Sequence, residues 1–174
     1  MKAKYLILPG YGNSDENHWQ SLWESKYPDF KRVSQKSWNH PACNDWIPVL
    51  EKAVAEAGND VKIVAHSLGC LLLSHWAAQT NLKIGGALLV ATPDPEGENF
   101  PQQALGFSPV AKQPFNFPST VIASNNDPYC SMSFSRSCAT HWGSQLIELG
   151  AYGHINSDSG LADWPFGLKE LTNL

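Results

Sequence analysis

Three residues of the types used in nucleophilic catalysis lie far apart in this sequence: Ser67, Asp127 and His154. A serine hydroxyl becomes a nucleophile when a histidine removes its proton and an acid holds that histidine in the correct tautomer. If the fold brings the three side chains together, they could transfer an acyl group through a covalent intermediate on the serine.

The segment around Ser67 is typical of a strand, a sharp turn and a helix in succession. Residues 61–70 read VKIVAHSLGC, and an apolar helical pattern follows them. This order is that of the nucleophile elbow, G-x-S-x-G, in which small residues let strand and helix pass closely. Ala65 occupies the first small position and Gly69 the second, so the strict pattern is missed by one methyl group. The alternative is a serine that only caps the helix.

Strand and helix patterns alternate along the chain. Helical patterns lie at about 15–27 (capped by Ser14 or Asp15), 45–57, 68–80, 131–142 and 164–171, and strand patterns at 4–8, 30–35, 61–65, 85–91, 120–124 and 145–149. Such alternation predicts a three-layer α/β/α fold in which helices cover both faces of a six-stranded parallel sheet. With right-handed crossovers and a doubly wound arrangement, the expected strand order is 2-1-3-4-5-6.

This topology predicts where the acid and the base lie. Asp127 directly follows the fifth strand and His154 follows the sixth, so both fall at the carboxyl edge of the sheet, where the elbow also lies. The order Ser, Asp, His is the one found in α/β-hydrolases. Asp94 follows the fourth strand at the same edge and remains an alternative acid, although an aspartate in a turn is its plainer role.

The same topology places the loop after the first strand beside the elbow. The backbone amides of Tyr11 and Leu68 are therefore expected to form an oxyanion hole, and the amide of Leu68 also lies at a helix N-terminus. The substrate pocket is expected to be lined by Gly10, His66, Phe100 and Phe107. The proline-rich segment 92–118, which also carries Phe115 and Phe117, is expected to cover the crevice as a lid, the alternative being a solvated connection.

Composition narrows the function further. A chain of 174 residues has the length of one domain, here residues 1–174, and its net charge of −4 without a basic cluster argues against nucleic-acid binding. The basic start is too short for a signal peptide, and no segment approaches the roughly 18 apolar residues of a membrane span. The four cysteines have neither zinc-site nor redox-pair spacing. We therefore expect a cytoplasmic protein with no metal, organic cofactor or membrane partner.

Four sequence blocks resemble a known family. They are LPGYGNS at 8–14, AHSLG at 65–69, NDPY at 126–129 and GHIN at 153–156. Together they resemble the retinoblastoma-binding protein 9 / YdeN family of small serine hydrolases, and the likeness covers nearly the whole chain. The resemblance implies an α/β-hydrolase fold without a large cap domain and the triad Ser67, Asp127 and His154. It favours Asp127 over Asp94.

The expected substrate is a small or medium ester or other acyl compound, with thioesters and amides left open. The alternative is a protein-interaction module on an idle hydrolase scaffold, because a fold does not fix a function. A retinoblastoma-type pocket protein is not an expected partner. Such binding needs Leu-x-Cys-x-Glu, and the nearest match, residues 68–72, has leucine at the glutamate position.

Overall fold

The computed structural model describes residues 3–174, in which six parallel strands form one sheet. The strand order is β2-β1-β3-β4-β5-β6, as the sequence predicted. The strands are β1 (Tyr5–Leu8), β2 (Phe30–Arg32), β3 (Lys62–His66), β4 (Gly86–Val90), β5 (Ser119–Ser124) and β6 (Gln145–Leu149).

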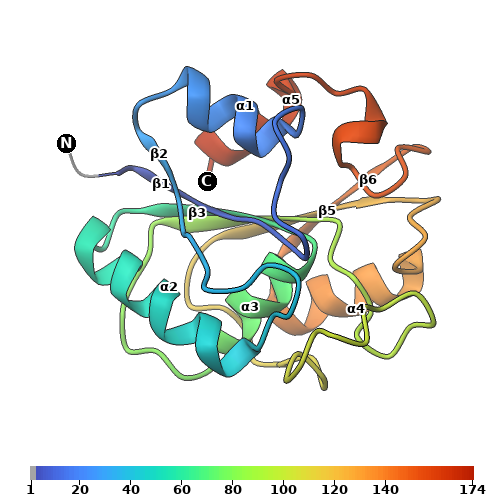
Figure 1. Ribbon diagram of the computed structural model, residues 1–174, viewed down its shortest axis with the longest axis horizontal. Helices are drawn as coiled ribbons and strands as arrows, with labels where there is room; N and C mark the ends of the chain where they lie inside the picture. Colours follow the sequence, from blue (N-terminus) through green and yellow to red (C-terminus); the bar gives the residue numbers. More distant parts are fainter. Residues whose placement is uncertain (1–2) are drawn as a thin grey trace.

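Helices cover both faces of this sheet and complete a three-layer α/β/α architecture (Figure 1). One layer consists of α1 (Trp19–Lys26) and α5 (Pro165–Thr172). The other consists of α2 (Cys43–Ala57), α3 (Leu68–Ala77) and α4 (Met132–Trp142). The central strands are buried on both sides, which explains their nearly continuous apolar sequences.

The core has two parts because successive strand residues point to opposite faces of the sheet. In β4, Ala87 and Leu89 pack in the core on the α2–α3–α4 side, whereas Leu88 and Val90 pack in the core on the α1–α5 side. Five fully buried tryptophans contribute to these two cores: Trp19, Trp23, Trp46, Trp76 and Trp142. The sheet is therefore packed on both faces against helices, and the loops at its carboxyl edge are anchored to this core.

Some predicted boundaries were wrong. Helix α1 begins at Trp19 instead of following Ser14 or Asp15, because the Nδ1 atom of His18 caps it by accepting the amide of Gln20. The hydroxyl of Ser14 instead donates to the Gln20 side chain, and both residues are buried. The second strand ends at residue 32 rather than 35, and a 3₁₀ turn at Ser157–Ser159 was not predicted.

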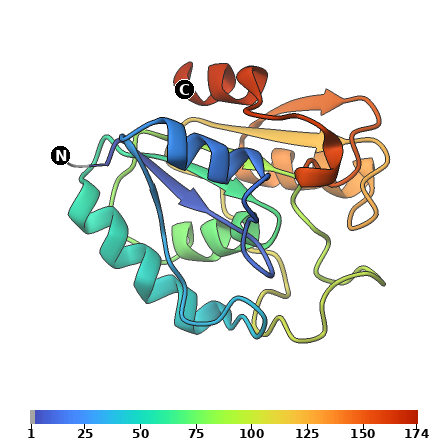
Figure 2. The ribbon, with the colours of Figure 1, turned by 45° about the horizontal axis from the view of Figure 1, so that its top comes forward.

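The connection between β4 and β5 contains no helix or strand, so the described chain carries no cap domain (Figure 2). Much of this connection is fixed to the body of the protein. The backbone of Leu105 donates to the carbonyl of Pro41 and accepts from the amide of Cys43 at the start of α2, and Phe107 lies in the core against Trp46. Phe115 and Phe117 stack on each other, and Phe115 stacks on Trp142. Much of the segment predicted as a lid is therefore packed against α2, α4 and the chain before α2.

Candidate active site

Ser67 lies on a strained turn between β3 and α3. Its φ of 54° and ψ of −124° are unusual for a residue other than glycine. The turn is tight because α3 starts directly against β1, and a Cβ atom on Gly69 would lie 2.3 Å from the carbonyl oxygen of Leu8. The amide of Ser67 donates to the carbonyl of Val90 at 2.9 Å, which ties the turn to β4. This geometry is that of a nucleophile elbow, and it exposes the hydroxyl at the carboxyl edge of the sheet.

The three predicted side chains meet there. The Oγ atom of Ser67 lies 2.8 Å from Nε2 of His154, and Nδ1 of His154 lies 2.9 Å and 3.0 Å from the two carboxylate oxygens of Asp127. Because a carboxylate can only accept, Nδ1 carries the proton and Nε2 is free to take the proton of the serine. The Asp127 side chain has no exposed surface, and Oδ1 also accepts the amide of Tyr129.

Asp94, the alternative acid, takes no part in this arrangement. Its Oδ1 atom accepts the amide of Glu96 at 3.0 Å, and its backbone amide donates to Tyr129. It is a turn residue at the same edge of the sheet.

Three successive residues of the His154 loop are held by side chains from three different elements. The amide of Gly153 donates to Oδ1 of Asn126 at 2.7 Å. The carbonyl of His154 accepts from Nε2 of His66 at 2.9 Å, and the carbonyl of Ile155 accepts from the indole of Trp19 at 2.8 Å. These contacts fix the backbone on both sides of the imidazole, and rigid support of this kind keeps reacting groups at a productive distance.

Two further imidazoles pack beside His154. The His66 ring lies 4.9 Å from that of His154 and 4.6 Å from that of His18. Burial lowers the pKa of His18 to about 4, and burial together with the neighbouring imidazoles lowers the pKa of His66 well below 6.5. Both are neutral at pH 7. Because Nε2 of His66 donates to a carbonyl, its Nδ1 carries the free lone pair.

The amides of Tyr11 and Leu68 are both free of hydrogen-bond partners within residues 3–174. The loop that carries Tyr11 approaches the elbow closely, since a Cβ atom on Gly10 would lie 2.8 Å from Cβ of Ser67 and 3.1 Å from the amide nitrogen of Leu68. Two unpaired donors beside a nucleophile could bind an oxyanion.

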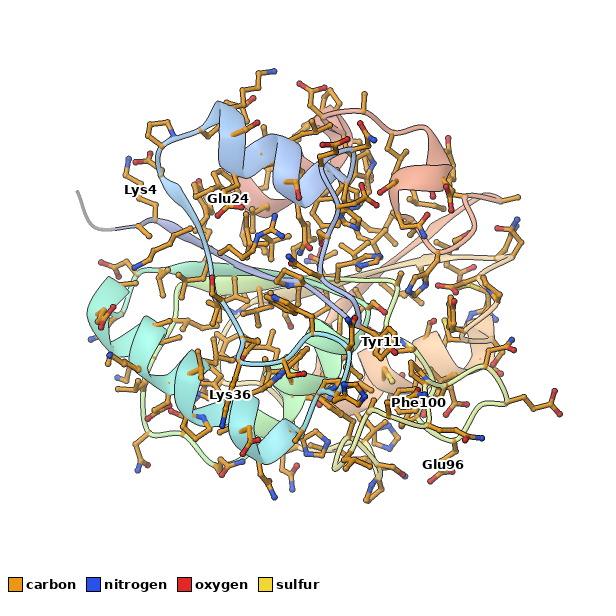
Figure 3. The ribbon with its side chains drawn as sticks, in the orientation of Figure 1. Lys4, Tyr11, Glu24, Lys36, Glu96 and Phe100 are labelled. Carbon is orange, nitrogen blue, oxygen red and sulfur yellow. The ribbon has the colours of Figure 1, made fainter. Side chains whose placement is uncertain are left out.

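A cavity of about 220 Å³ opens over Ser67. Gly10, His66 and Phe100 line it, and Figure 3 labels Phe100 together with Tyr11, which lines it from the loop after β1. The prediction for Phe107 was wrong, because this side chain has no exposed surface and packs in the core. Its apolar character reflects core packing, which a sequence pattern does not distinguish from a pocket lining.

Several lining residues were missed from the sequence. His18 was not among the residues expected at the site, yet it lies in the wall of this cavity, and its Nε2 atom is buried without a partner. Asp15, Tyr129 and Asn156 also line the cavity. Each belongs to a loop that follows β1, β5 or β6, so the predicted strand order could have identified them as neighbours of Ser67.

The described part of the chain offers no second reactive nucleophile among its cysteines. All four cysteines are free, and burial raises the pKa of Cys43, Cys70 and Cys138 to about 12 and that of Cys130 to about 11, so they are unreactive thiols at neutral pH. No cluster of three or more histidine, cysteine or acidic side chains suited to a metal ion occurs among residues 3–174. Within the same residues, no helix has the length and hydropathy needed to cross a bilayer.

Comparisons with known proteins agree with this geometry. A family model described as serine hydrolase matches residues 5–173. YdeN of Bacillus subtilis (strain 168), which is named as a hydrolase, is 26% identical over 99% of this chain and 96% of its own. Its crystal structure superposes with a TM-score of 0.78 at 24% identity and covers 98% of this chain and 97% of that chain.

Two other solved structures extend the comparison. A YdeN-like hydrolase from Pectobacterium atrosepticum is 30% identical, with a TM-score of 0.85 over 99% of this chain and 90% of that chain. The α/β-hydrolase domain-containing protein 10 from mouse, at 15% identity, has a TM-score of 0.62 over 86% of this chain and 81% of that chain, and this likeness concerns the fold alone. The matches support the YdeN side of the resemblance seen in the sequence and the α/β-hydrolase fold.

Proposed function

Since the chain belongs to the serine hydrolase family, we propose that it cleaves carboxylic esters of small to medium acyl groups through an acyl-enzyme on Ser67. The observation that carries this proposal is the continuous hydrogen-bonded chain from Ser67 through His154 to Asp127, with distances of 2.8 Å and 2.9 Å. The first distance lets the base reach the proton of the nucleophile, and the second lets the carboxylate orient the base.

The reaction has two steps. In the first, Nε2 of His154 takes the hydroxyl proton of Ser67 while Oγ attacks the carbonyl carbon, and the amides of Tyr11 and Leu68 donate to the resulting oxyanion. His154 then gives its proton to the leaving oxygen, and the bond between the carbonyl carbon and that oxygen breaks. In the second step water attacks the acyl group in the same way and restores the hydroxyl. Asp127 stabilises the imidazolium that forms in each step.

The size and lining of the cavity support the proposed substrate class. A volume of about 220 Å³ suits an acyl group of a few carbons better than a long lipid chain. No lysine or arginine of the described chain lines it, so it offers no cation to a charged acyl group. Thioesters and amides share the same tetrahedral intermediate and remain within the proposal.

A series of p-nitrophenyl esters from acetate to decanoate tests this function. We expect the wild-type protein to hydrolyse the short esters fastest, and we expect Ser67→Ala to lower kcat by roughly 10⁴–10⁶-fold, because the nucleophile is lost. Ser25→Ala, which changes an exposed serine on α1, is the matched control and should retain wild-type rates. Hydrolysis that survives in Ser67→Ala would contradict the proposal.

A further inference from the structure

A second cavity adjoins the one over Ser67. It has a volume of about 520 Å³, and Tyr129, His154, Asn156 and Asp158 border both cavities. Ser67 borders only the first. The two cavities therefore meet at the proposed base, with the nucleophile and the two free amides on one side and a cleft between Tyr129 and Tyr152 on the other.

The proposed reaction assigns different parts of an ester to the two sides. The acyl carbon must lie against Oγ of Ser67, with its oxygen near the amides of Tyr11 and Leu68. The leaving oxygen must receive a proton from Nε2 of His154, so it must come within hydrogen-bond distance of that atom. Whatever is attached to the leaving oxygen then extends past the imidazole, away from the acyl group.

We propose that the cleft between Tyr129 and Tyr152 is the leaving-group subsite and that Asp158 makes it prefer cationic over anionic leaving groups. This inference rests on the proposed function. The cleft holds His154 but not Ser67, as a leaving-group site must, and its larger volume accommodates a group that departs after acylation.

The charges around the cleft favour a cationic leaving group over an anionic one. Among the described residues, neither cavity is lined by a lysine or an arginine. Asp158 lies where the two cavities join, and its carboxylate forms no hydrogen bond or ion pair within residues 3–174. Tyr129 and Tyr152 are 36% and 43% exposed, and the faces of aromatic rings attract ammonium groups.

Acetate esters of three phenols test the proposal, because they share one acyl group and differ in the charge of the leaving group. The phenols carry a trimethylammonium, a tert-butyl or a sulfonate group at the meta position. In Asp158→Asn we expect kcat/KM to fall roughly 3- to 10-fold for the ammonium ester and to rise by a similar factor for the sulfonate ester, with little change for the tert-butyl ester. These factors are those of one partly solvated charge pair.

Asp60→Asn is the matched control. Asp60 is also exposed, its carboxylate has no hydrogen-bond or ion-pair partner among the described residues, and it precedes β3 at the opposite edge of the sheet. The Asp60→Asn substitution removes the same charge far from the cleft, so it should leave the relative rates of the three esters unchanged. Asp158→Asn keeps the backbone amide that donates to Asn156, so the loop should keep its conformation.

A second readout separates binding of the leaving group from a general disturbance of the site. The acetyl-enzyme is the same for all three esters, so Asp158→Asn should change the acylation rate in a pre-steady-state burst and leave the deacetylation rate unchanged. Equal changes for all three esters, or an altered deacetylation rate, would overturn this inference while leaving the hydrolase intact. If the wild type hydrolyses none of the esters, the proposed function fails as well.

Discussion

At the scale of single residues, the site is notable for two buried neutral imidazoles beside the proposed base. His18 caps α1 through Nδ1 and is 3% exposed, and burial lowers its pKa to about 4. An unfolded histidine has a pKa near 6.5, so between pH 6.5 and pH 4 the unfolded chain binds more protons at this residue than the folded one does. The free energy of unfolding should therefore fall as the pH falls through this range.

The variant His18→Asn tests this linkage. Asparagine can accept the Gln20 amide as an N-cap but does not titrate. Between pH 7 and pH 4.5 we expect the wild type to lose about 2 kcal/mol more unfolding free energy than the variant, measured by urea denaturation. Equal losses in the two proteins would show that His18 titrates normally in the folded state.

The predicted proximity of residues distant in the sequence was confirmed where chain order carried the information. Ser67, Asp127 and His154 each directly follow a strand or lie in the loop after one, so the strand order alone placed them together. Phe107 failed because a buried aromatic side chain and a pocket-lining one look alike in sequence. The contact of His18 with the site was missed because it depends on where α1 begins, and element boundaries are set by local caps.

At the scale of elements, the close crossing of β1 and α3 holds the elbow in its strained conformation. Gly69 lies in the first turn of α3, where a Cβ atom would lie 2.3 Å from the Leu8 carbonyl oxygen and 3.0 Å from that of Pro9. Helix propensity by itself favours alanine over glycine by about 1 kcal/mol. Overlap with backbone atoms costs more, because neither the strand nor the helix can move without disturbing the core.

We therefore expect Gly69→Ala to lower the free energy of unfolding by at least about 2 kcal/mol, as measured by urea denaturation. Gly150→Ala is the control, because a Cβ atom there meets no atom within 4 Å, and its effect should stay within about 0.5 kcal/mol. A neutral or stabilising effect of Gly69→Ala would mean that the crossing can relax and that the elbow is not held by it.

The elements themselves were largely predictable, since hydrophobic periodicity and alternating strands and helices fix the type of each one. Hydrophobic periodicity did not predict the path of residues 91–118, which connect β4 to β5. This connection is pinned by backbone contacts of Leu105 and by ring stacking of Phe115 on Trp142, and such long-range contacts leave no periodic pattern.

At the scale of the whole molecule, the strand order brings together loops that lie far apart in the chain. Strands β1, β3, β5 and β6 all end at one edge of the sheet, and the loops that follow them supply the free amide of Tyr11, the elbow, Asp127 and His154. Parallel strands joined by right-handed crossovers require this convergence. The topology therefore determines which residues meet at the proposed active site, and we expect the sequences of the loops to determine which substrate fits.

The most direct test of this account is the mass of the protein after reaction with a fluorophosphonate. We predict one phosphonyl adduct per chain, located by peptide mass spectrometry on Ser67 and absent from Ser67→Ala, with Asp127→Asn labelled far more slowly than the wild type. An unlabelled wild-type protein that is folded, or an adduct on any residue other than Ser67, would contradict the proposal that these three side chains form a working nucleophilic site.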